Sequence, residues 1–124
     1  MGLDRRQLGA AAEEIAATYL AAHGVKILER NYRRRLGELD VIARQGDTLL
    51  IVEVRTRSTS AYGGAAASVD GPKRRRIVRA AQQLLQRRRA LARLAVRFDV
   101  IVVSDAATPE PRVEWIRHAF DTSG

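Results

Sequence analysis

Hydrophobic positions recur along the chain with two periods and divide it into helices and strands. Helical spacing predicts a first helix from a cap at Asp4 to about His23, and a second helix from a cap at Asp70 to about residues 87–89. Short apolar or alternating runs predict strands over residues 25–30, 37–44, 49–57, 98–104 and 113–117. This order indicates one α/β domain, residues 1–124, in which a mixed five-stranded sheet lies between helices.

The stretch 37–57, GELDVIARQGDTLLIVEVRTR, reads as two antiparallel strands around a tight turn. A four-residue loop, QGDT, places Val41 opposite Val52 and Leu39 opposite Val54, so that apolar side chains share one face of the hairpin. A three-residue loop would shift the partner of every residue by one position. Hydrophobic matching therefore favours the four-residue loop.

Carboxylates on the other face of this hairpin are its unusual feature. The favoured register places Asp40 opposite Glu53 and Glu38 opposite Arg55. Two carboxylates that are cross-strand neighbours, with Cβ atoms about 5 Å apart, repel each other by roughly 1 to 4 kcal/mol. A divalent cation, a shared proton or basic neighbours would offset this repulsion. Asp40 and Glu53, with Arg55 on the same face, are therefore a candidate metal site beside a candidate anion site.

Charge identifies the expected partner. The chain has 22 Lys and Arg against 14 Asp and Glu, a net charge of +8, and a pI of about 11.1. Arg predominates, and its planar guanidinium binds phosphate in a bidentate manner, so nucleic acid is the favoured partner over a merely solubilising charge excess. The second helix begins with the basic residues that we expect to bind nucleic acid: Lys73, Arg74, Arg75, Arg76 and Arg79.

Several other classes are excluded or disfavoured by composition. The chain has no cysteine, which rules out disulfides, thiolate zinc sites and cysteine nucleophiles. No apolar run is long enough for a membrane span and the start lacks a signal peptide, so a cytoplasmic protein with no membrane association is expected. Aromatic residues make up only 5%, which disfavours binding of single strands by base stacking. The small residues of 58–69 predict a flexible loop beside the site.

The acidic residues would suit Mg²⁺, or Mn²⁺ in its place, because hard cations prefer oxygen ligands and retain several waters. In this interpretation Asp40 and Glu53 bind the metal, and Arg55 contacts the phosphate of a phosphodiester. Glu13, at the edge of the apolar stripe of the first helix, would be an outer ligand through water. The alternative is a network of salt bridges between these carboxylates and flanking arginines.

The segments AEEIAATYL, ILERNYR, GELDVIA, LIVEVRTRS and RFDVIVV together resemble the YraN-type family of small bacterial proteins, within the restriction-endonuclease-like (PD-(D/E)XK) superfamily. The resemblance implies that superfamily's three-layer fold and an endonuclease that hydrolyses phosphodiesters of DNA, including branched DNA. Asp40 matches the metal-binding aspartate, Glu53 the acidic residue of the E-x-K element, and Glu13 the first-helix glutamate of archaeal Holliday-junction resolvases. Resolvases of this kind often pair to cut two strands, which leaves a homodimer open.

Two positions depart from this pattern. Arg55 stands where the pattern has lysine, and Ala12 stands where a glycine commonly precedes the helix glutamate. Arginine keeps its proton at ordinary pH and so cannot act as a general base, although it can orient a phosphate. Two alternatives to an active nuclease follow. One is a binding module that retains the nuclease fold without turnover, and the other is a scaffold for a protein partner.

Overall fold

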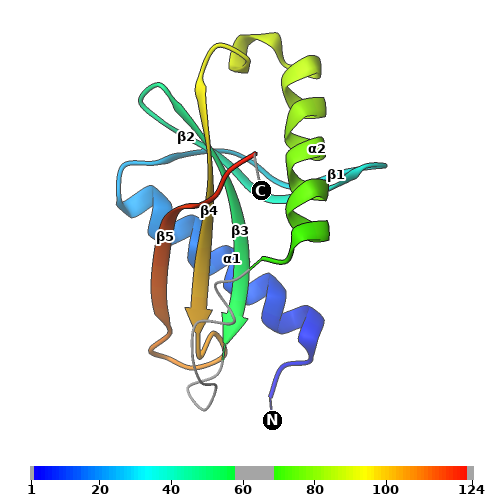
Figure 1. The fold of residues 1–124 in the computed structure, drawn as a ribbon. Coiled ribbons are helices and arrows are strands. Elements are labelled where there is room, and N and C mark those ends of the chain that lie inside the picture. The colour runs from blue at the N-terminus through cyan, green and yellow to red at the C-terminus, as the bar shows by residue number, and fades with distance from the viewer. Residues whose placement is uncertain (1, 58–68, 123–124) are drawn as a thin grey trace.

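The computed structural model describes residues 2–57 and 69–122, which form one sheet covered by a helix on each face (Figure 1). Helix α1 spans Arg5–Ala22 and helix α2 spans Gly71–Arg87, followed by the short 3₁₀ helix η2, Arg89–Leu91. Both predicted caps are confirmed: Asp4 accepts a hydrogen bond from the backbone of Gln7, and Asp70 accepts one from the backbone of Lys73. Neither helix in the described ranges has the length and apolar character needed to cross a membrane.

The sheet confirms the predicted order and the mixed topology. Its strands are β1 (Lys26–Arg34), β2 (Gly37–Gln45), β3 (Thr48–Arg57), β4 (Ala95–Ser104) and β5 (Arg112–Phe120). They lie side by side in chain order; β3 and β4 are parallel, and the other three pairs are antiparallel. Helix α2 makes the connection between the parallel pair. The α/β fold with a mixed five-stranded sheet between helices is therefore as the sequence predicts, and it is consistent with a nuclease-like fold.

Two apolar layers hold the helices to the sheet. On one face, Leu20 and the small residues of α1 pack against Val41, Val52 and Ile101. On the other face, α2 packs mainly on β2. It covers the strand side chains that alternate along the chain with those facing α1. Strand β4 supplies buried residues to both layers, which explains its continuous apolar run.

The hairpin register is confirmed from its turn as far as one pair of valines. Val41 lies opposite Val52, and the pairing continues without a shift to Gln45 opposite Thr48. The turn itself is therefore two residues, Gly46 and Asp47, and not the predicted four, because Gln45 and Thr48 belong to the strands. Beyond Val41 the ladder between β2 and β3 stops, and Leu39 does not meet Val54. Leu39 instead pairs with Tyr32 of β1 and is buried in the α2 layer. The strands therefore diverge at Asp40.

The basic run 33–35 lies partly within β1, which extends beyond the strand predicted over residues 25–30. Strand β1 continues through Arg34, and Arg33 lies opposite Glu38 in the pairing with β2. The arginine side chains remain exposed, because β1 is an edge strand with a solvated face. The predicted flexible loop, except for the buried Val69, lies outside the described residues.

Gly37, at the start of β2, fixes the distance between the hairpin and α2. A Cβ atom added here would lie 2.9 Å from the backbone oxygen of Arg76. We expect Gly37→Ala to lower the free energy of unfolding by roughly 1 to 3 kcal/mol, because helix backbone would have to move. Urea unfolding measures this loss. Gly9→Ala is the control, since open space surrounds Gly9 and alanine favours helix; an equal loss in both variants would contradict the steric explanation.

Candidate active site

Asp40 lies where the strands of the hairpin diverge. Its side chain accepts a hydrogen bond from the backbone of β3, as a strand carbonyl would in a continuous ladder. Its Oδ2 accepts a hydrogen bond of 2.9 Å from the backbone N–H of Val54. This contact fixes the orientation of the carboxyl group and satisfies a strand donor that has no ladder partner across β2. Burial raises the pKa of Asp40, while the hydrogen bond from Val54 opposes the increase.

Glu53 lies beside Asp40 and is the more buried of the two. Only 6% of Glu53 is exposed, and the two carboxyl groups are within hydrogen-bonding reach of each other. Burial, and then the charge of Asp40, raise the pKa of Glu53 to about 7. The predicted proximity of Asp40 and Glu53 is thus present. In the absence of metal, burial and the closeness of the two like charges favour retention of one proton by the pair.

The cation at this pair is Lys73 of α2. Its Nζ lies 2.8 Å from Oε1 of Glu53. Arg55 is half-buried, and within the described ranges no hydrogen bond or ion pair joins it to Glu53. Glu38 is exposed and forms an ion pair with Arg33 at 3.3 Å, so it does not lie opposite Arg55 as the register had predicted. The divergence of the strands removes that pairing.

Glu13 approaches the same region from α1. It is partly buried, and burial followed by the charge of Asp40 raises its pKa. Its side chain also has a hydrogen bond with Asn31, which opposes this increase. Helix α1 thus brings Glu13 within electrostatic reach of Asp40, whereas Glu14 is exposed and pairs with Arg30 at 2.8 Å. The partial burial of Glu13 agrees with its predicted position at the edge of the apolar stripe.

The donor set at Asp40 and Glu53 fits a hard divalent cation. Both groups supply carboxylate oxygens, they repel each other when ionised, and the Lys73 ammonium and one backbone N–H offset part of their charge. No three His, Cys, Asp or Glu side chains in residues 2–57 and 69–122 are close enough to bind one ion together. A cation bound here would therefore keep several waters, as Mg²⁺ commonly does.

The basic side chains at the start of α2 divide between two surroundings. Lys73 contacts the carboxylate pair, while Arg75, Arg76 and Arg79 are exposed. A surface cavity of about 210 Å³ lies between α2 and the end of the chain; its lining is Arg74, Arg75, Val78, Arg79, Gln82, Asp121 and Thr122. The arginines expected to bind nucleic acid are thus gathered on the helix that supplies Lys73.

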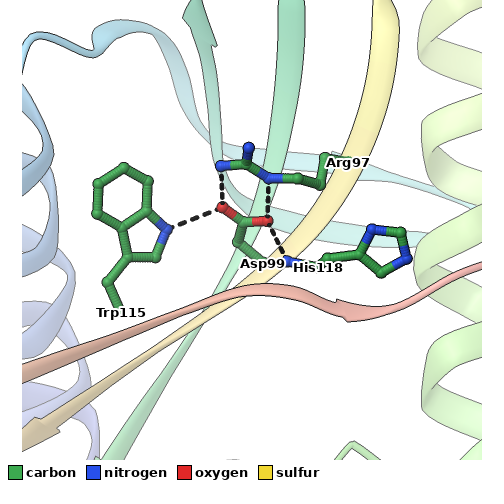
Figure 2. Close-up of polar contacts among 4 residues, drawn as sticks. All are labelled: Arg97, Asp99, Trp115 and His118. Carbon is green, nitrogen blue, oxygen red and sulfur yellow. Dashed lines mark hydrogen bonds and ion pairs between the residues drawn. The ribbon is translucent and has the colours of Figure 1, made fainter.

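A second buried carboxylate, Asp99 of β4, has a structural role (Figure 2). Its two oxygens accept 2.8 Å hydrogen bonds from Nε and Nη2 of Arg97. They also accept bonds of 2.8 Å from Nε1 of Trp115 and 3.0 Å from the backbone N–H of His118. With four donors and no exposure, Asp99 has no capacity left for a metal or substrate.

Residues 12–103 match the model of the uncharacterised protein family UPF0102. The chain belongs to the UPF0102 family. This confirms the family resemblance read from the sequence motifs. The matched segment contains Glu13, Asp40, Glu53 and Lys73, so the whole candidate site lies within the family region.

Relatives in this family match nearly the full chain. A UPF0102 protein of Methylococcus capsulatus is 48% identical over 120 residues, covering 97% of this chain and 95% of the relative. One of Pseudomonas aeruginosa is 43% identical over 118 residues, covering 94% of each. One of Nitrosomonas europaea is 44% identical over 115 residues, covering 93% of this chain and 94% of the relative. The UPF0102 similarity therefore extends over α1, the sheet and α2.

Proposed function

We propose that this protein is a cytoplasmic, Mg²⁺-dependent endonuclease that hydrolyses phosphodiester bonds of DNA, with branched DNA as the first substrate to test. The observation that carries this proposal is the buried Asp40–Glu53 pair beside the ammonium of Lys73. Paired carboxylates with raised pKa values and a specific charged partner are characteristic of functional sites. The nuclease-like fold and the family membership are consistent with this activity.

In this proposal Asp40 and Glu53 would hold the cation, Mg²⁺ or Mn²⁺. A bound divalent ion neutralises charge on a phosphate and lowers the pKa of a water molecule, which favours attack on phosphorus. The protein contributes orientation: the N–H of Val54 holds Asp40 in place. Glu13 would assist from α1 through water. Hydrolysis would form a bond from the water oxygen to phosphorus and break the bond to the sugar oxygen that leaves; the attacking water would lose a proton to solvent, and the departing oxygen would gain one from solvent.

DNA would be held by the arginines of α2. The first half of this helix carries four arginines without an acidic residue, and such a surface binds the phosphate backbone with a steep dependence on salt. Aligned backbone dipoles add positive potential at this end of the helix. The binding surface and the carboxylate pair therefore adjoin through the first turn of α2, which supports phosphodiesters as the substrate class.

We expect Asp40→Asn to reduce the rate of Mg²⁺-dependent DNA cleavage at least about 100-fold, because one ligand charge and its orienting contact change together. The measurement is cleavage of linear and four-way-junction DNA by purified protein. Asp47→Asn is the matched control, since Asp47 is fully exposed at the tip of the same hairpin. Equal cleavage by both variants would attribute the activity to a contaminant.

Arg55 supports a second candidate, a DNA-binding module without turnover, because in the described ranges no hydrogen bond or ion pair joins it to the carboxylate pair. Such a module would bind DNA in a salt-sensitive, Mg²⁺-insensitive way, and neutralising Arg74, Arg75 and Arg76 would weaken it. Cleavage by the wild-type protein that Asp40→Asn abolishes would exclude this candidate.

A further inference from the structure

Lys73 has a position unlike that of the other basic residues of α2. Its ammonium contacts the buried Glu53 at 2.8 Å, yet 37% of the lysine side chain is exposed, against 7% for Glu53. An ammonium has three N–H donors, and Glu53 occupies one of them. Lys73 therefore joins the carboxylate pair to the solvent-facing surface from which a phosphodiester would arrive.

Three local features fix Lys73 in this position. Asp70 accepts a 2.8 Å hydrogen bond from its backbone N–H, and Pro72 occupies the first turn of the helix. One helical turn further on, the backbone of Arg76 packs against Gly37 with no room for a side chain. The start of α2 is therefore held against the hairpin by backbone contacts, independently of the ion pair.

We propose, building on the nuclease function above, that Lys73 is the lysine of this reaction site. It balances the Asp40–Glu53 pair in the metal-free protein, and its ammonium contacts the scissile phosphate when a divalent cation occupies the two carboxylates. The strand position expected to carry this charge holds Arg55, and within residues 2–57 and 69–122 no hydrogen bond or ion pair joins Arg55 to the pair. The charge comes instead from the adjoining helix.

Metal binding without DNA tests the first half of this proposal. Titration calorimetry of Lys73→Met with Mn²⁺ at pH 8 should give an affinity roughly threefold to tenfold higher than wild type, because a competing cation next to the ligands has been removed. Lys26→Met is the control, since Lys26 is an exposed lysine of β1. Unchanged or weaker Mn²⁺ binding by Lys73→Met would overturn the proposal, because loss of a merely structural contact would not tighten binding.

Cleavage at saturating Mg²⁺ tests the second half. Lys73→Met should lower the turnover rate at least about 30-fold with little change in DNA affinity, and Lys73→Gln should behave in the same way. Adding Arg55→Lys to Lys73→Met should raise the turnover rate at least about tenfold above that of Lys73→Met, since a lysine is then present on the strand beside Glu53. Wild-type turnover in Lys73→Met would overturn this role.

The two proposals fail in distinguishable ways. If the wild-type protein does not cleave any DNA, the nuclease function and the phosphate contact of Lys73 both fail, while the Mn²⁺ titration still decides the charge-balancing role. If Asp40→Asn abolishes cleavage but Lys73→Met cleaves normally, the nuclease function stands and the assignment of Lys73 is wrong.

Discussion

Replacing Glu53 by glutamine is expected to raise the free energy of unfolding of the metal-free protein at pH 8 by roughly 1 to 3 kcal/mol. Burial and the charge of Asp40 hold the pKa of Glu53 at about 7, against an ordinary value of 4.5. The folded state therefore binds this proton more tightly than the unfolded state, and ionisation at pH 8 costs folding energy. Glutamine has a similar shape and no charge, so the variant avoids this cost.

The same argument gives the sign of the pH dependence. Because the folded pKa is raised, the contribution of Glu53 is most favourable below 4.5 and is lost as the pH rises through about 7. Urea unfolding in EDTA between pH 5 and pH 8 should show a decrease in stability for wild type, and a smaller decrease for Glu53→Gln. Glu38→Gln, an exposed change on the same hairpin, should show the same decrease in stability between pH 5 and pH 8 as wild type. A Glu53→Gln variant less stable than wild type at pH 8 would contradict the raised pKa.

Stability is thus expected to oppose function at this position. Glu53→Gln should also lose DNA cleavage under the nuclease proposal, because the amide cannot supply the negative charge that a divalent cation requires. A gain in stability together with a loss of activity would be the signature of a strained site, in which like charges are held together for a ligand. A structural salt bridge would lose stability when its carboxylate is removed.

Asp99→Ala, in contrast to Glu53→Gln, is expected to lower the free energy of unfolding by about 3 to 5 kcal/mol. The substitution leaves the guanidinium of Arg97, the indole N–H of Trp115 and the backbone N–H of His118 without their acceptor. Such a loss would be a large part of the stability of an ordinary domain. Urea unfolding measures it, with Asp47→Ala as the exposed control.

A double substitution separates the buried charge from the rest of this network. Combining Asp99→Leu with Arg97→Met removes both partners, so no guanidinium is left partly buried without a counter-ion. This double variant should be more stable than Asp99→Leu alone. If the changes in the free energy of unfolding are additive, Arg97 does not depend on Asp99. The explanation that Asp99 stabilises the fold as the acceptor for Arg97 is then wrong.

The structural features that the sequence predicted correctly are those that depend on residues close together in the chain. The twofold alternation of the hairpin was sufficient to place Val41 opposite Val52, and therefore Asp40 near Glu53. The cap at Asp70 followed from its position before Pro72 and an amphipathic run. These features need only local backbone geometry, which the order of side chains specifies directly.

What the sequence did not predict depends on packing between distant elements. Lys73 appeared as one of several basic residues, and its contact with Glu53 arises only when α2 packs on Gly37. Likewise, Arg97 and Asp99 are neighbours on one face of β4, whereas Trp115 joins them from another strand. One signal for Lys73 was present in the sequence: it is the single lysine in a helix otherwise rich in arginine.

The two outermost strands also determine how copies of this protein can associate. The edges are β1 and β5, and exposed basic side chains lie along both: Lys26, Arg33, Arg34, Arg112 and Arg117. Register shifts interrupt the pairing of both strands with their neighbours. Charged, irregular edges resist the addition of another strand. The protein is thereby protected against edge-to-edge aggregation, and a dimer that cuts two DNA strands would have to form through a surface other than an extended sheet.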